Sequence, residues 1–188
     1  AGITAREDVV KAIDDYTEAQ KSILSEVILK NEIEFDGERA NVRTGPTNLS
    51  CLITSAMVDA TGADLAITNG GGIRASIKAG EVTRGDIITV LPFGNYIVTK
   101  KMKGSDIKAA LEHGLSQYPN ANGAFPQVAH VEYLFDEKKP AGERVTHVWI
   151  KGVKLDPEKE YVVATNDFMA VGGDGYPFAD LPLLNEYQ

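Results

Sequence analysis

The sequence has a single cysteine, Cys51, among its 188 residues, which excludes a framework of internal disulfides. Basic residues are also scarce, because 19 Lys and Arg stand against 27 Asp and Glu and leave a formal net charge of −8. A free-standing nucleic-acid-binding protein usually carries a basic patch, so this balance argues against a nucleic-acid partner. No apolar run approaches the roughly 18 residues that a membrane helix needs, so no membrane segment is expected.

Motifs for catalysis and metal binding are missing as well. The histidines His113, His130 and His147 are isolated in the sequence, and none belongs to a metal-ligand spacing. We interpret all three as structural, with His130 and His147 on neighbouring strands where they can face each other. No Gly-x-Ser-x-Gly elbow supplies a nucleophile, and Cys51, without a histidine beside it, is expected to be a packed small side chain. The sequence therefore predicts neither catalytic nor metal-ligating residues in this chain.

The N-terminal part has the apolar periodicity of a helix. Val9, Ile13, Tyr16 and Ile23 recur in steps that fit one helix face, and Thr4 and Glu7 have the spacing of a capping box. We predict one long helix over about residues 5–30, acting as a connector to a part of the protein not present here. The chain lacks an initiator Met and a recognisable signal peptide, so we expect a processed or excised chain.

The rest of the chain alternates between strand and helix patterns. The expected helices are Thr47/Asn48 to Ala60 with Gly62 as the stop, and about residues 106–116 with Ser105 as the cap. Strands are expected over 32–36, 63–68, 128–135, 144–151 and 160–165, and the segment 181–188 is expected to be irregular. Three helices and at least five strands indicate an α+β fold with mixed sheets and flanking helices.

The most conspicuous loop follows the strand over 63–68. Asn69 is followed by Gly70-Gly71-Gly72 and Arg74, which formally matches a dinucleotide-binding fingerprint. Too few residues follow before Gly80 for the helix that this fingerprint requires, so we reject that interpretation. Three glycines still allow a ligand to approach backbone N–H groups, and Arg74 is either a phosphate- or carboxylate-binding cation or a surface charge.

Other loops carry residue types that suit a nucleotide. Phe93 and Phe168 each lie among turn residues, where they either clamp a planar base or pack over the core. Asp174 lies between glycines, where it either binds ribose hydroxyls or makes a turn. Arg39 and Arg43 form a pair before the helix at Asn48, and the basic cluster Lys100, Lys101 and Lys103 is expected to be a solvated edge.

Five of these segments together resemble the C-terminal domain of the 5′-nucleotidase family, which includes UDP-sugar hydrolases and 2′,3′-cyclic-nucleotide phosphodiesterases. The segments are NLSCLITSAMVDA (48–60), ADLAITNGGGIRA (63–75), GDIITVLPFGN (85–95), GAFPQV (123–128) and TNDFMAVGGDGY (165–176). The resemblance implies a four-layer α/β/β/α arrangement. It also implies that residues 1–30 are a connector helix and that residues 31–188 are the nucleotide-binding domain.

The resemblance assigns roles to nine residues. Phe93 and Phe168 match the rings that hold the base, with Asn95 and Gly123 at the base edge, and Asp174 matches the carboxylate that holds the ribose. The remaining matches are the arginines on the ribose and phosphate side and the asparagine that opens the glycine loop: Arg39, Arg43, Arg74 and Asn69.

The family resemblance places the chemistry in another part of the parent protein. Family enzymes hold two divalent metal ions in a separate N-terminal metallophosphoesterase domain, whose motifs this chain lacks. The parent is expected to hydrolyse nucleoside 5′-monophosphates to nucleoside and phosphate, in the periplasm, secreted or at the cell surface, while this chain alone is inactive. Alternatives are a 2′,3′-cyclic-nucleotide phosphodiesterase/3′-nucleotidase or UDP-sugar hydrolase parent, and a binding or scaffold module without catalysis.

Overall fold

The computed structural model describes residues 6–187. The α-helices and short 3₁₀ turns are α1 (Glu7–Leu24), α2 (Asn48–Thr61), η1 (Gly70–Gly72), α3 (Arg84–Val90), α4 (Gly104–Gly114), α5 (Asp167–Ala170) and η2 (Gly173–Gly175). The strands are β1 (Val27–Asn31), β2 (Leu65–Asn69), β3 (Gly80–Thr83), β4 (Ile97–Lys103), β5 (Pro126–Ala129), β6 (Val131–Phe135), β7 (Val145–Ile150), β8 (Val153–Lys154), β9 (Glu160–Asn166) and β10 (Leu183–Tyr187). The predicted α+β class, with mixed sheets and flanking helices, is confirmed.

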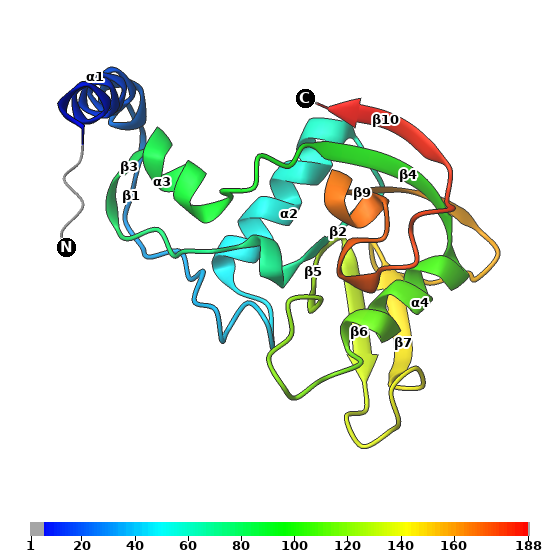
Figure 1. The fold of residues 1–188 in the computed structure, drawn as a ribbon. Helices are drawn as coiled ribbons and strands as arrows, with labels where there is room; N and C mark the ends of the chain where they lie inside the picture. The colour runs from blue at the N-terminus through cyan, green and yellow to red at the C-terminus, as the bar shows by residue number, and fades with distance from the viewer. Residues whose placement is uncertain (1–5, 188) are drawn as a thin grey trace.

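The centre of the fold is a five-stranded mixed sheet in the order β10-β4-β9-β2-β5 (Figure 1). Strands β2 and β9 are parallel, and the other neighbours are antiparallel. Successive residues of a strand point to opposite faces, so β2 supplies Ala66 to one face and Leu65 and Ile67 to the other. Ala66 packs with Met57 and Val58 of α2, whereas Leu65 and Ile67 belong to the core that includes α4 and strands β6 and β7.

Helix α2 has the termini that the sequence predicts. The Thr47 side chain accepts a hydrogen bond from the Ser50 N–H, and the Ser50 hydroxyl accepts one from the Thr47 N–H, which completes a capping box. Gly62 ends the helix in the left-handed region at φ 66°, a conformation that glycine adopts without strain.

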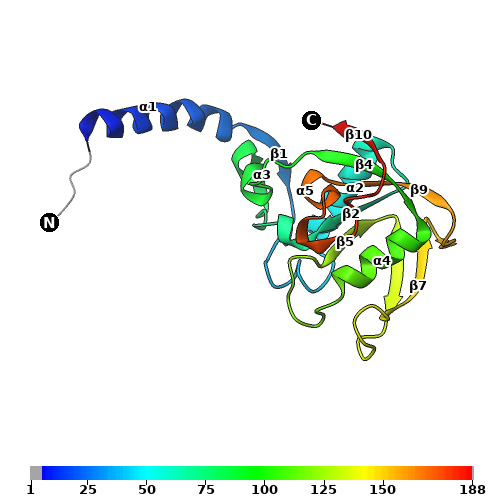
Figure 2. The ribbon, with the colours of Figure 1, turned by 45° about the vertical axis from the view of Figure 1, so that its right-hand side comes forward.

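The N-terminal helix is shorter than predicted. Helix α1 ends at Leu24, and residues from Val27 onward form β1, which pairs with β3. None of the α1 residues is buried, and the helix projects from the rest of the fold (Figure 2). Of the predicted capping box, Thr4 lies outside the described residues, and Glu7 is the first residue of α1, whose N-cap is Arg6.

Two other expected strands differ from the structure. The segment 32–36 pairs only through Phe35, which bridges to Ile77. The alternating run 128–135 is divided into β5 and β6 at His130, whose backbone has φ 61°. The strands expected over 128–135 and 144–151 do pair, because β6 and β7 are antiparallel neighbours.

The C-terminal segment 181–188 is not irregular as predicted, because its residues Leu183–Tyr187 form β10 along the edge of the sheet beside β4. Consequently β4 is an interior strand, and the expectation of a solvated basic edge is wrong for Lys100, which is 3% exposed. Lys101 and Lys103 do lie at the surface, in ion pairs with Glu160 and Glu158.

The helix α4 begins two residues earlier than predicted, at Gly104, with Lys103 rather than Ser105 as the N-cap. Gly104 and Ser105 instead donate their N–H groups to the carbonyls of Lys159 and Pro157. An added Cβ at Gly104 would lie 2.1 Å from the Asp156 carbonyl oxygen, so this helix start depends on close backbone approach.

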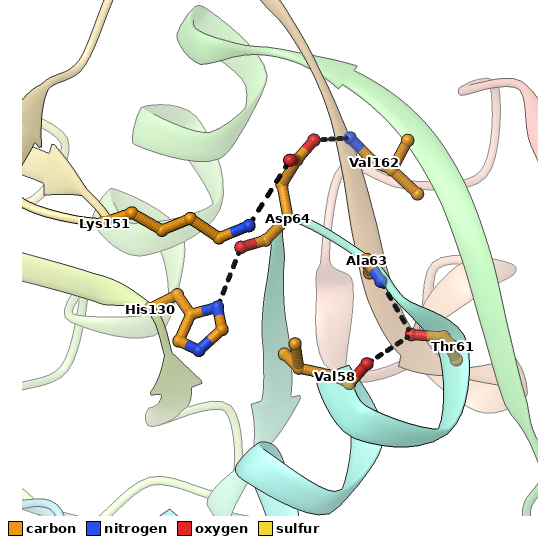
Figure 3. A network of polar contacts seen from close by, with 7 residues as sticks. All are labelled: Val58, Thr61, Ala63, Asp64, His130, Lys151 and Val162. Atoms are coloured by element: carbon orange, nitrogen blue, oxygen red, sulfur yellow. Dashed lines mark hydrogen bonds and ion pairs between the residues drawn. The ribbon is translucent and has the colours of Figure 1, made fainter.

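Asp64 joins the start of β2 to three neighbouring segments (Figure 3). Its Oδ2 accepts a hydrogen bond from the Val162 N–H at 2.9 Å, its Oδ1 lies 3.6 Å from Lys151 Nζ, and its carbonyl oxygen lies 3.1 Å from His130 Nδ1. His147 lies opposite Leu134 in the β6–β7 register and stacks on Trp149. The two histidines therefore do not face each other, contrary to the prediction.

Candidate functional site

A cavity of about 580 Å³ opens at the ends of β2 and β9. It brings together segments that are far apart in the sequence. Its lining residues are Arg43, Asn69, Gly71, Gly72, Arg74, Phe93, Asn95, Asn122, Gly123, Phe168 and Asp174. Every residue assigned from the family resemblance lies in this lining except Arg39, which is exposed nearby.

The glycine loop allows two other segments to reach the cavity. Gly70 lies close to the backbone of Val42, the residue before Arg43. An added Cβ at Gly70 would be 1.9 Å from the Val42 carbonyl oxygen. The Gly71 N–H donates to the Gly123 carbonyl at 2.8 Å. Only a short 3₁₀ turn follows β2 here, and no α-helix begins before β3, which supports rejection of the dinucleotide fingerprint. The loop therefore places Arg43 and Gly123 beside each other.

Two phenylalanine rings border the cavity from different elements. Phe93 lies between α3 and β4, and Phe168 lies on the short helix α5. Their exposed fractions are 60% and 42%, which is high for such large apolar side chains. The guanidinium carbon of Arg74 lies 5.7 Å from the centroid of the Phe93 ring, within the range of a cation–π contact.

A second, mainly apolar hollow of about 350 Å³ adjoins the cavity. Helix α2 forms one wall with Ile53 and Met57. Phe93 and Asn95 line both spaces, so the Phe93 ring borders a polar compartment and an apolar one.

Asp174 is held in a defined orientation at the polar end. Its Oδ2 accepts a hydrogen bond from Asn69 Nδ2 at 2.7 Å. Asn166 in turn donates to Asn69 Oδ1 at 3.0 Å, which fixes the orientation of the Asn69 amide. The Asp174 backbone has φ 53°, a left-handed conformation that is uncommon for residues other than glycine.

The arginines create a local positive field in this acidic chain. Burial lowers the pKa of Arg43, the charges of Arg39 and Arg74 lower it further, and Asp174 acts in the opposite direction. The Arg43 Nε is buried and, within residues 6–187, has no hydrogen-bond partner. An anion placed here would satisfy this donor and relieve the repulsion among the guanidinium groups.

The structure also identifies residues that sequence motifs did not assign. Asn122 lines the cavity, Asn166 supports Asn69, and His113 Nε2 lies 2.7 Å from the Asp174 carbonyl oxygen. Asn122 could have been found from the sequence, because it directly precedes Gly123 in an Asn-Gly pair typical of turns. Nothing in the local sequence of His113 indicates its contact with Asp174.

No three His, Cys, Asp or Glu side chains within residues 6–187 are placed to hold a metal ion. Cys51 is exposed rather than packed as predicted, because it lies on the outer side of α2. No helix in this range has both the length and the apolar character needed to cross a lipid bilayer.

Comparisons with known proteins agree with the fold and identify the family. The model of the family described as "5'-nucleotidase, C-terminal domain" matches residues 25–180. The chain is 42% identical over 173 residues to the trifunctional nucleotide phosphoesterase protein YfkN of Bacillus subtilis (strain 168), covering 87% of this chain and 12% of YfkN. It is 35% identical over 178 residues to the protein UshA of Escherichia coli (strain K12), covering 95% of this chain and 31% of UshA.

A solved structure is similar over nearly the whole chain. The 5′-nucleotidase precursor from Thermus thermophilus superimposes with a TM-score of 0.87 at 41% identity, covering 93% of this chain and 36% of that chain. The present chain thus spans only about a third or less of the length of these relatives. The family model, the sequence identities and the shared fold together show that the chain belongs to the 5′-nucleotidase family, as its C-terminal domain.

Proposed function

We propose that this chain is the substrate-binding domain of a two-metal 5′-nucleotidase that hydrolyses nucleoside 5′-monophosphates. The observation that carries the proposal is the one cavity lined by two phenylalanine rings, one aspartate and two arginines. These groups suit the base, the ribose and the phosphate of one nucleotide. Membership in the 5′-nucleotidase family supports the same ligand class.

The base would lie against Phe93 and Phe168. Both side chains are partly exposed to solvent, and covering their rings with a planar base removes apolar surface from water. Base–aromatic stacking contributes about 1–3 kcal/mol per base in nucleic-acid-binding proteins. Asn95 and Gly123 lie on the same lining and would approach the base edge.

The ribose and phosphate would occupy the polar end. The Asp174 carboxylate has an oxygen bonded to Asn69 and further acceptor capacity for ribose hydroxyls. Arg43 and Arg74 line the cavity, and Arg39 adds charge from outside it. The net charge of −8 does not oppose this assignment, because local cations dominate within a Debye length of roughly 8 Å.

We place hydrolysis itself in another domain of the parent, where two divalent metal ions would be bound. Helix α1 exposes the apolar side chains Val9, Ile13, Tyr16 and Ile23. Their exposure supports the existence of a packing partner for this helix. We accordingly propose that the α1 connector contacts that catalytic domain, and that the parent acts outside the cytoplasm. No step of phosphate hydrolysis is assigned to residues of this chain.

A second parent activity is favoured by one comparison. The relative with 42% identity is named a trifunctional nucleotide phosphoesterase, which supports a parent with more than one phosphoesterase activity. We propose 2′,3′-cyclic nucleotides as the second substrate class. The base contacts described above can serve either substrate. The contact of Asp174 with ribose hydroxyls applies only to the 5′-monophosphate, because a 2′,3′-cyclic phosphate esterifies both hydroxyls.

Calorimetric titration with AMP and adenosine tests the proposal on the 188-residue chain. Phe93→Ala should weaken binding about 10- to 100-fold, the equivalent of the stacking contribution. Val171→Ala is the matched control, because Val171 is 76% exposed and lies outside the cavity lining.

Two results would contradict the proposal. The absence of AMP binding at millimolar concentration, with Phe93→Ala indistinguishable from the original chain, would favour a scaffold module. Phosphate release from AMP by the pure chain with added Mn²⁺ or Zn²⁺ would show that catalysis does not require another domain.

A further inference from the structure

The aspartate of the site lies on a loop that needs support from outside. This aspartate loop, residues 171–177, connects α5 to the buried Phe178 and contains Gly172, Gly173 and Gly175. Glycines increase the number of backbone conformations open to the loop, and the left-handed φ of Asp174 is costly for a residue with a Cβ. The direction of the Asp174 carboxylate must therefore be imposed by contacts with other elements.

Lys100 contacts both ends of the aspartate loop. Its Nζ donates to the Ala170 carbonyl at 2.8 Å, immediately before the loop, and to the Phe178 carbonyl, immediately after it. The Ala179 carbonyl lies 3.4 Å away as a third acceptor. An ammonium group has three N–H donors, so one side chain links the two ends of the loop.

The environment of Lys100 is unusual for a lysine. It is 3% exposed on an interior strand, and no carboxylate within residues 6–187 forms a salt bridge with it. Burial lowers its pKa, and the charge of Asp180 acts in the opposite direction. A buried charge costs stability, and an apolar side chain of similar volume is often as stable or more so. Overall stability alone thus gives no reason for an ammonium group at this position.

His113 supports the middle of the same loop from α4. Its Nε2 lies 2.7 Å from the Asp174 carbonyl oxygen, and its ring packs edge-on against Tyr176 at 5.1 Å. The Tyr176 hydroxyl donates to the Ala124 carbonyl at 2.6 Å, next to the lining residue Gly123. The loop is thereby connected to helix α4 and to the segment that carries Gly123.

We propose that Lys100 is a positioning residue for ribose recognition: it clamps both ends of the aspartate loop, while His113 fixes Asp174 between them. The role in recognition rests on the proposed function, in which Asp174 binds the ribose hydroxyls. The clamp itself is a property of the free chain and is testable without a ligand.

The test compares Lys100→Met with Lys101→Met. The two lysines are adjacent on β4 but point to opposite faces, and Lys101 is exposed and paired with Glu160. Titrations use adenosine and 2′,3′-dideoxyadenosine, which lacks the 2′- and 3′-hydroxyls of the ribose. Lys100→Met should weaken adenosine binding by about tenfold, the loss of one well-oriented polar contact, and leave dideoxyadenosine binding unchanged. Lys101→Met should change neither affinity.

Amide hydrogen exchange supplies the ligand-free readout. In Lys100→Met, the amides of residues 171–178 should exchange faster, while those of β2 keep their protection. A uniform increase over the whole chain, an equal loss of affinity for both nucleosides, or no change in loop exchange would overturn the proposal.

A second variant keeps the test valid if Lys100→Met does not fold. His113→Leu should increase loop exchange and weaken adenosine binding selectively, and His113→Gln, which retains an N–H donor, should restore both. An inert His113→Leu would overturn the role of His113. If the original chain does not distinguish adenosine from dideoxyadenosine, the ribose assignment of Asp174 fails, and the exchange data still decide whether Lys100 is a clamp.

Discussion

At the scale of single residues, two glycines of the site separate stability from recognition. Gly70 has no room for a side chain, because an added Cβ would lie 1.9 Å from the Val42 carbonyl oxygen. At Gly123 an added Cβ would be 3.6 Å from Asp174 Oδ2 and 4.0 Å from Arg43 Cζ, which are ordinary contacts. The first glycine is required by the backbone, and the second keeps space open between two charged groups.

Substitution of these glycines by alanine should therefore affect different quantities: Gly70→Ala the stability of the fold, and Gly123→Ala the affinity for AMP. Gly70→Ala should lower the free energy of unfolding by about 2 kcal/mol or more, whereas Gly123→Ala should change it by less than about 0.5 kcal/mol. Gly123→Ala should instead weaken AMP binding by about tenfold, since its methyl group enters the space between the carboxylate and the guanidinium. Urea unfolding and calorimetry measure the two quantities, and a destabilised Gly123→Ala with normal AMP affinity would contradict this division.

At the scale of elements, the N-cap of α2 links the sequence to the packing of the sheet. Thr47→Ala removes the acceptor for the Ser50 N–H and should lower the free energy of unfolding by about 1 kcal/mol. Thr47→Ser retains the oxygen and should keep most of the stability. Urea denaturation compares the variants, and equal losses in Ala and Ser would show that the methyl group of Thr47, rather than the cap, stabilises the helix.

The same element shows what sequence reasoning can predict. Helix α2 was predicted well because its signals, Thr47 and Gly62, are local. Strand β10 was missed because it depends on pairing with β4, from residues more than 80 positions earlier, and its own residues are mostly exposed. The burial of Lys100 was missed for the same reason, since only the strand order makes β4 an interior strand.

Prediction of the site divides in a similar way. The aromatic, acidic and basic residues could be identified because they belong to recognisable motifs, and the structure places all but Arg39 around one cavity. Supporting residues such as His113 and Asn166 could not be identified from local sequence. Their contacts with Asp174 and Asn69 join segments 61 and 97 positions apart.

At the scale of the whole molecule, two tyrosines near the core link stability to alkaline pH. Burial raises the pKa of Tyr133 from 10.0 to about 12, and burial also raises the pKa of Tyr176. Between pH 10 and about 12, both tyrosines keep their phenol protons in the folded chain and lose them in the unfolded chain. Stability is therefore fully present below about pH 10 and decreases as pH rises above it, by up to about 1.4 kcal/mol per pH unit for each tyrosine.

Urea unfolding across the interval from pH 10 to about 12 measures this dependence. Tyr133→Phe should reduce the slope, because the variant has no phenol to titrate at that position. A slope identical in the variant and the original chain would show that Tyr133 does not contribute to alkaline unfolding.

The position of AMP in a crystal structure of its complex with the chain tests the central claim most directly. We predict the purine between Phe93 and Phe168, the ribose hydroxyls at Asp174, and the phosphate beside Arg43 and Arg74. AMP bound outside this cavity, or inside it with the base away from both rings, would contradict the assignment of the site.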